Sequence, residues 1–116
     1  MSSILSDVKA DIGVDDSDNS FDSQIMRSIN TSFGFLHRIG AGPANGFSIN
    51  DESTDWAEFI SQDDPQYVVL EMCKQYISLR AEQLFDKTYA SSYNSAIKDL
   101  VSEIEFSIFI EVDPNE

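Results

Sequence analysis

The chain has 116 residues, about the length of one domain, and its 21 Asp and Glu outweigh 7 Lys and Arg to give a formal net charge of −14. Nucleic-acid affinity depends on Lys and Arg, so this balance argues against tight, direct binding of DNA. Apolar residues make up 41% of the chain, enough for folding, and we expect a single helical domain over residues 1–116.

Cysteine content and hydropathy limit the location of the protein. Cys73 is the single cysteine, so neither an intrachain disulfide nor a thiolate metal cluster is expected. The first residues lack the apolar segment of a signal peptide, and no apolar run approaches the roughly 20 residues that span a bilayer. We therefore expect synthesis in the cytoplasm and no membrane partner.

Two helices are predicted in the first third of the chain. Apolar residues recur at helical spacing over residues 4–12, with Ser3 as a cap and Gly13 as a stop signal. A longer helix is predicted from about Ser20 to His37. Asp18, in the acidic segment before it, is the expected N-cap.

A long loop is predicted over about residues 40–63, where Gly, Pro, Asn, Ser and Asp replace the helical pattern. Loops of this length are usually functional or disordered. This one contains several apolar residues, namely Phe47, Ile49, Trp56, Phe59 and Ile60. Two interpretations are open: Trp56 and Phe59 fold back onto the core, or they dock on a neighbouring subunit.

Two more helices are predicted in the second half of the chain. Asp64 is the expected cap of the first, with Pro65 at its first position, and the segment from Tyr67 to Phe85 is apolar enough to be the buried centre of the fold. Ser91 is the expected cap of the last helix, which ends near Phe106. Residues 106–112 alternate apolar and polar side chains imperfectly, so they are either a frayed helix end or a short extended arm. The C-terminal arm is expected over about residues 107–116 and ends in a flexible polar tail.

These patterns predict an all-α fold, a small antiparallel bundle of four to five helices with a long loop between the second and third helices and a flexible C-terminal tail. The apolar helix faces also predict a core. Its members are Phe21, Ile25, Ile29, Met72, Tyr76, Leu79, Ile97, Leu100 and Ile104.

Residues suited to catalysis are few. His37 lies near the end of the second predicted helix, where a cation is stabilised by the helix dipole, and Cys73 lies on the most apolar helix, where a thiol is inert. The spacing of Asp16, Asp18 and Ser20 matches the first ligands of a calcium-binding loop. The match ends there, because the sixth position holds Phe in place of Gly and the twelfth holds Arg in place of Glu. We expect no enzyme activity, no metal and no cofactor.

The order of elements resembles the head-to-tail connector (adaptor) proteins of tailed bacteriophages. The resemblance runs over roughly residues 4 to 108 and includes Asp7-Val8-Lys9, Asp15-Asp16, Phe21-Asp22, Asp64-Pro65, the segment from Lys74 to Asp86, and the closing helix from Tyr93 to Phe106. The sequence departs from that family in the loop over 40–62 and at Asp86-Lys87-Thr88, where a proline often follows the aspartate.

The resemblance implies a structural protein of the virion neck. Its subunits would form a ring, a dodecamer on the portal protein, that extends the DNA channel and joins the capsid to a tail protein or to the next neck (stopper) protein. DNA would pass through without specific binding. A ring needs heterologous surfaces, and the candidate contacts with other subunits or the portal are Phe47, Trp56, Phe59, Ile60, Phe106, Phe109 and Ile110.

Two other classes of protein compete with this interpretation. An acidic inhibitor that mimics DNA, or another soluble acidic helical binding protein, also fits the charge, although the carboxylates cluster at helix ends and in the loop. A hydrolase is disfavoured, because one His and one Cys offer little for a nucleophile and its base.

Overall fold

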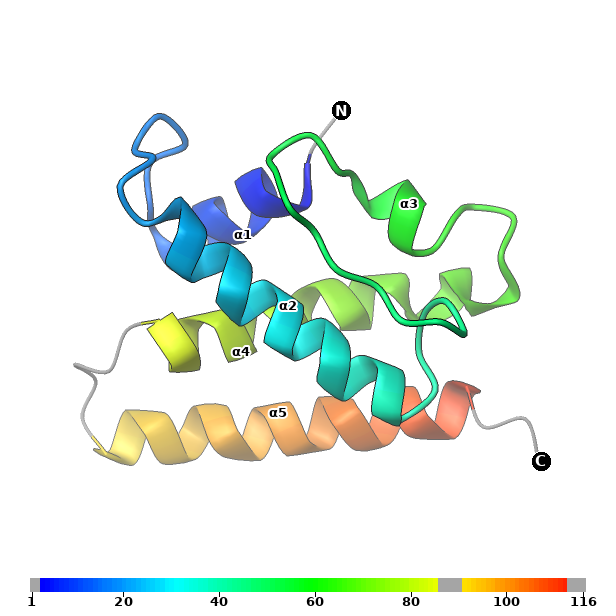
Figure 1. Cartoon of the computed structure of the whole chain (residues 1–116). Helices are drawn as coiled ribbons and strands as arrows, with labels where there is room; N and C mark the ends of the chain where they lie inside the picture. The colour runs from blue at the N-terminus through cyan, green and yellow to red at the C-terminus, as the bar shows by residue number, and fades with distance from the viewer. Residues whose placement is uncertain (1–2, 86–90, 113–116) are drawn as a thin grey trace.

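The computed structural model describes residues 3–85 and 91–112, and this part of the chain is helical, with one isolated β-bridge between Ser3 and Asp55. The elements in chain order are α1 (Ile4–Ile12), α2 (Asp22–Arg38), α3 (Trp56–Phe59), the 3-10 helix η1 (Pro65–Val69), α4 (Leu70–Phe85) and α5 (Ser91–Val112) (Figure 1). The predicted all-α bundle is confirmed. The last residues of the expected flexible tail, 113–116, lie outside the described residues.

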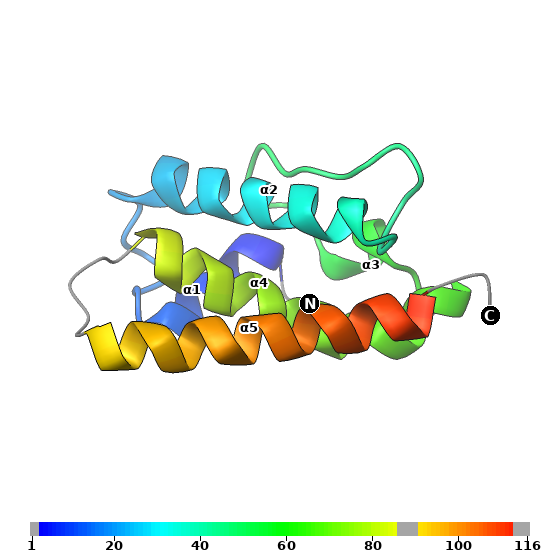
Figure 2. The same ribbon diagram turned by 90° about the horizontal axis from the view of Figure 1, so that it is seen from below.

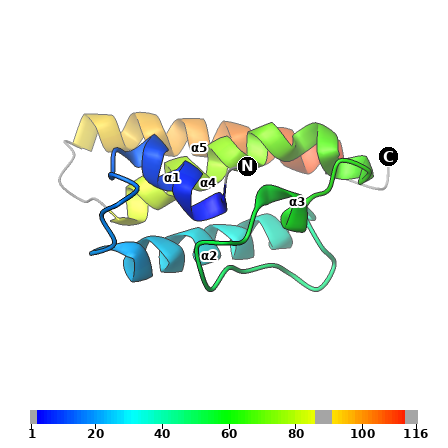
Figure 3. The ribbon, with the colours of Figure 1, turned by 90° about the horizontal axis from the view of Figure 1, so that it is seen from above.

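The helices lie in layers around α4. Helix α4 contacts α1, α2, α5 and η1, and in two opposite views it lies between α2 on one side and α5 on the other (Figures 2 and 3). It runs opposite to both of them. Cys73, Tyr76 and Ile77 of α4 are fully buried. The central position of α4 agrees with the prediction from its apolar sequence. A helix that is apolar on most of its surface is stable only when other elements cover it on several sides.

Helix α1 has the ends that its sequence predicts. The hydroxyl of Ser3 accepts a hydrogen bond from the amide of Ser6 at 3.0 Å, and Gly13 closes the helix in the left-handed conformation with φ 85°. Glycine reaches this conformation without the steric cost that other residues meet. Ser3 therefore starts the helix through a side-chain hydrogen bond to its first turn, and Gly13 ends it through its backbone conformation.

The predicted start of α2 is wrong. The helix begins at Asp22, and its N-cap, Phe21, makes no capping bond through its side chain. The carboxylate of Asp18 instead accepts the amide of Ser20 at 3.0 Å, because an Asp side chain readily closes a turn with the backbone two residues on. Phe21 precedes the helix and is 42% exposed, so it is not the core residue that was predicted.

A buried lysine joins α1 to α2. Lys9 is only 2% exposed, and its Nζ lies 2.8 Å from a carboxylate oxygen of Asp22 and 3.1 Å from the carbonyl oxygen of Asp16. Removing one partner of such a buried pair typically costs about 3–5 kcal/mol of stability. The acidic turn between the two helices is therefore held by a cation from the helix before it.

The core otherwise follows the predicted faces with a few corrections. Asp64 is the N-cap of η1 and accepts the amide of Gln66 at 2.8 Å, ahead of Pro65. Five predicted core residues are buried, namely Ile25, Ile29, Tyr76, Ile97 and Ile104. Met72 and Leu79 are half-buried, and Leu100 is 37% exposed because it lies at the edge of the buried face of α5. The side chain of Ser91, the expected cap of α5, lies outside the described part of the chain.

Helix α5 extends to Val112, so of the two alternatives for this segment the helical end is confirmed, and the arm is wrong for residues 107–112. Ile108 is fully buried and Val112 packs against the core, which continues the buried face formed by Val101 and Ile104. Spacings of three and four residues maintain one helix face, so the apolar pattern keeps this segment helical. The imperfect alternation of residues 106–112 concealed that period.

Candidate interaction surface

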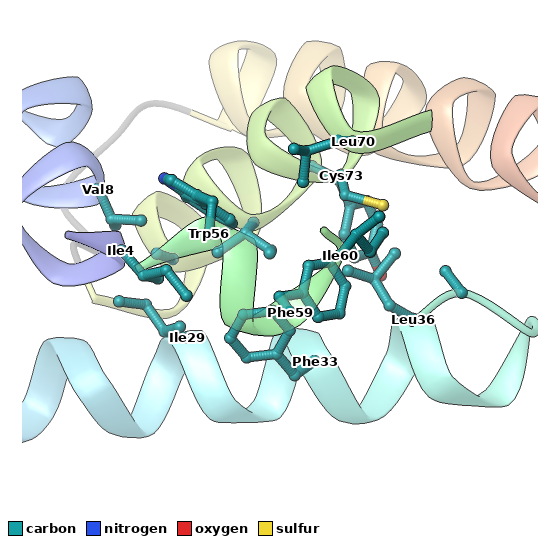
Figure 4. Packing of buried hydrophobic residues seen from close by; sticks show 14 of the residues in the cluster. Ile4, Val8, Ile29, Phe33, Leu36, Trp56, Phe59, Ile60, Leu70 and Cys73 are labelled. Atoms are coloured by element: carbon teal, nitrogen blue, oxygen red, sulfur yellow. The ribbon is translucent and has the colours of Figure 1, made fainter. Parts of the chain in front are cut away.

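The apolar residues of the long loop belong to the core of the subunit. Trp56, Phe59 and Ile60 are 6%, 4% and 1% exposed. In the close-up view they point inward between α2 and α4, with Phe59 beside Phe33 of α2 (Figure 4). Phe47 is half-buried, and the centroid of its ring lies 5.0 Å from the centroid of the Phe33 ring. In this structure these four predicted contact residues are therefore not an exposed surface, because they complete a cluster of packed rings.

Polar side chains anchor the same loop. The amide group of Asn30 donates to the carbonyl of Ile49 at 2.9 Å and accepts its N–H at 2.7 Å. Gln66 acts in the same way, accepting the amide of Gly42 at 2.7 Å and donating to the carbonyl of Gly40 at 3.0 Å. Trp56 donates its indole N–H to Asp7 at 2.7 Å. These pairs could not be predicted from the sequence, since Asn and Gln are also common on solvated surfaces.

The outward side of α5 exposes large apolar residues. Phe106, Ile110 and Phe109 are 64%, 55% and 46% exposed. Phe106 and Ile110, together with Asp99 and Glu103, lie opposite the face that packs on α4, and Phe109 lies to one side of them. We define the α5 stripe by its four exposed residues at steps of four, three and four, namely Asp99, Glu103, Phe106 and Ile110. The neighbouring η1 exposes Tyr67 and Val68 as well. Helix α5 is thus apolar on two sides and only one of them is covered.

The outward side of α2 has a different chemistry. We define the α2 stripe by four exposed residues at the same steps, namely Arg27, Thr31, Gly34 and Arg38. Residues 23–50, which include nearly all of α2, hold none of the 21 carboxylate side chains of the chain. A shallow depression beside the α2 stripe is lined by Met26, Asn30 and Ile49, among others, and again by no carboxylate. This gap in the charge pattern is visible in the sequence but was not used in the prediction.

The side chains that could take part in catalysis are Cys73, Tyr76 and His37, and the first two are buried in the core. Burial raises the pKa of the Cys73 thiol to about 12, so the thiol stays protonated and unreactive near neutral pH. Burial also raises the pKa of Tyr76, whose hydroxyl donates to the carboxylate of Glu105 at 2.6 Å. His37 is exposed in the last turn of α2. Cys73 and Tyr76 are both buried on α4, whereas His37 is exposed on α2, so the histidine does not join the other two in one site.

The acidic turn before α2 uses its carboxylates in local hydrogen bonds. The amide and hydroxyl of Ser17 lower the pKa of Asp15, and the hydroxyl and amide of Ser20 lower that of Asp18. Both side chains therefore close turns. Within residues 3–85 and 91–112, no group of three or more His, Cys, Asp or Glu side chains is arranged to hold a metal ion.

A helical subunit with exposed apolar and charged helix faces is typical of proteins that act by binding other proteins. A family model described as phage connector protein matches residues 4–115. The chain therefore belongs to the phage connector proteins, a family of structural proteins of the phage neck, and the resemblance seen in the sequence is confirmed. No curated protein and no solved structure matches the chain. Among the helices of residues 3–85 and 91–112, none combines the length and the apolar composition that a membrane span requires.

Proposed function

We propose that the chain assembles as a ring beneath the portal protein, extends the DNA channel there and joins the capsid to a tail protein or to the next neck protein. The observation that carries this proposal is the match to the phage connector family, which spans residues 4–115. The exposed apolar side of α5 supports it. Phe106, Phe109 and Ile110 are the residues that we assign to contacts between subunits or with the portal.

The charge of the chain supports a passive role toward DNA. A net charge of −14 repels phosphates, so a duplex passing through a ring of such subunits would not adhere to its wall. We expect that a gel-shift titration at low salt will show no retention of duplex DNA. Retention that weakens steeply with added salt would contradict this part of the proposal, because it would reveal contacts with phosphates.

The test of the ring is its presence in virus particles. A lysate producing the phage is fractionated on a density gradient, and the fractions are probed for this chain and for the portal protein. We expect the chain to sediment with particles at a fixed ratio to the portal. If all of it stays in the soluble fraction, the proposal is wrong, and the acidic DNA mimic becomes the better explanation of the charge.

A further inference from the structure

The α5 stripe and the α2 stripe lie on opposite sides of the subunit. Each helix buries its inner face toward α4, which lies between them (Figures 2 and 3). The outward stripes therefore face away from each other and cannot meet within one chain. Two different surfaces on opposite sides of a subunit are what a head-to-tail ring requires, since each copy presents one surface to either neighbour.

Charge favours contact between unlike stripes. The α5 stripe contains Asp99 and Glu103, and Glu111 lies nearby, so two α5 stripes facing each other in parallel would bring carboxylates together. The α2 stripe contains Arg27 and Arg38 within a segment of 28 residues, 23–50, that has no carboxylate. Complementary charges attract and like charges repel across an interface. In a chain of net charge −14, the α2 stripe is thus the surface best suited to receive the α5 stripe of a second copy.

The ring also sets the direction of the contact. Helices α2 and α5 run in the same general direction within one subunit (Figures 1, 2 and 3). A ring of many copies relates neighbours by a small rotation, which leaves helix directions almost unchanged. The α2 of one copy therefore runs roughly parallel to the α5 of its neighbour.

A parallel arrangement aligns the two stripes residue by residue, because both have steps of four, three and four. Arg27 then faces Asp99, and Thr31 faces Glu103. Gly34 faces Phe106, which at 64% is the most exposed apolar residue among the side chains of α5 that the structure describes. A methyl group added at Gly34 would meet nothing within 4 Å, so the space above this glycine is open to a neighbouring ring. Arg38 faces Ile110 and can cover it with its aliphatic stem.

We propose that the α5 stripe of one subunit packs in parallel on the α2 stripe of the next copy, with Phe106 above Gly34 and Asp99 beside Arg27. The inference rests on the proposed ring and deepens it, since it names the two surfaces that join neighbouring copies. It assigns a role to Gly34, an exposed glycine in the interior of a helix, where the residue is otherwise unfavourable.

The first test is Gly34→Leu, produced from a plasmid during growth of a phage that lacks its own copy of the gene. The new side chain points into open space, so we expect the melting temperature of the purified chain to be unchanged or higher. It would collide with Phe106 of the neighbour, and we expect the amount recovered with particles to fall by about tenfold or more. Wild-type recovery of this variant would overturn the inference. Ala10→Leu, a small-to-large change at an exposed position of α1 outside both stripes, is the matched control and should assemble.

A charge exchange tests the register. We expect Arg27→Glu to lower recovery with particles about tenfold, and Asp99→Lys in the same chain to restore it to within about threefold of wild type. Because the two residues lie on opposite sides of one subunit, restoration requires contact between copies. Failure of Asp99→Lys to restore any assembly would count against the alignment.

Cross-linking tests the proposed interface independently of the proposed ring. With cysteines at both Thr31 and Glu103, a short bis-maleimide reagent should join particle-bound subunits into a ladder of multimers, whereas either substitution alone should give none. Cys73 is fully buried and is common to all variants. Dimers from Glu103→Cys alone would reveal contacts between like stripes and overturn the inference. A wild-type chain absent from particles would instead refute the ring.

Discussion

Two groups of apolar residues were candidates for subunit contacts, and they differ in burial in the structure. Phe47, Trp56, Phe59 and Ile60 of the loop enter the core, whereas Phe106, Phe109 and Ile110 of α5 stay exposed. The difference lies in backbone freedom. A loop can bend until its apolar side chains face inward, but a helix fixes the direction of each side chain, and α5 already presents another apolar face to α4.

The largest expected effect is that of Trp56→Ala. Trp56 is 6% exposed and packs near α1 and α4, so we expect a loss of about 3–5 kcal/mol in the free energy of unfolding, measured with urea. Val68→Ala, at a site that is 72% exposed, is the control and should change it by less than about 0.5 kcal/mol. If the Trp56→Ala subunit is as stable as wild type and fails only in assembly, Trp56 is a contact residue between subunits and not a core residue.

A second prediction concerns the glycines of the loop. Gly42 and Gly46 have nearly the same positive φ, 89° and 87°, but a methyl group at Gly42 would approach the ring of Phe59 to 2.5 Å, whereas one at Gly46 would meet nothing. Gly46→Ala should cost about 1–2 kcal/mol from backbone strain alone. Gly42→Ala should cost about 1–3 kcal/mol more, because Phe59 must move. Equal losses in thermal unfolding would show that Phe59 is not packed there.

The anchoring of the loop predicts a smaller effect for Asn30→Ala. This change leaves the N–H and the carbonyl of Ile49 without their partner, and an unsatisfied buried polar group typically costs about 1–3 kcal/mol. We expect the amide of Ile49 to exchange with deuterium much faster, while amides of α5 should exchange faster only to the extent that the global free energy of unfolding falls. Thr31→Ala, one residue away and exposed, should leave the exchange at Ile49 unchanged.

The sequence predicted those parts of the fold that depend on short-range chemistry. Ser3 and Gly13 end α1 as expected, and periodicity identified α4 as the central helix. It did not predict where the loop lies, because the anchors Asn30 and Gln66 act on backbone that is 19 to 26 residues away. It also left open whether Trp56 and Phe59 join the core or a neighbouring subunit, and it did not distinguish the other five contact candidates from one another. Separating the three exposed ones required knowing which face of α5 meets α4, which is a property of packing.

The smallest expected change in stability belongs to the double substitution Phe106→Ser and Ile110→Ser. Both side chains are more than half exposed, so their removal should leave the free energy of unfolding within about 0.5 kcal/mol of wild type. Assembly should fail, because the apolar part of the α5 stripe is gone while Asp99 and Glu103 remain. Sedimentation with particles measures this loss, and urea unfolding of the same preparation measures the fold. A marked loss of stability would mean that α5 buries this face within its own subunit, and the contrast with the loop would disappear.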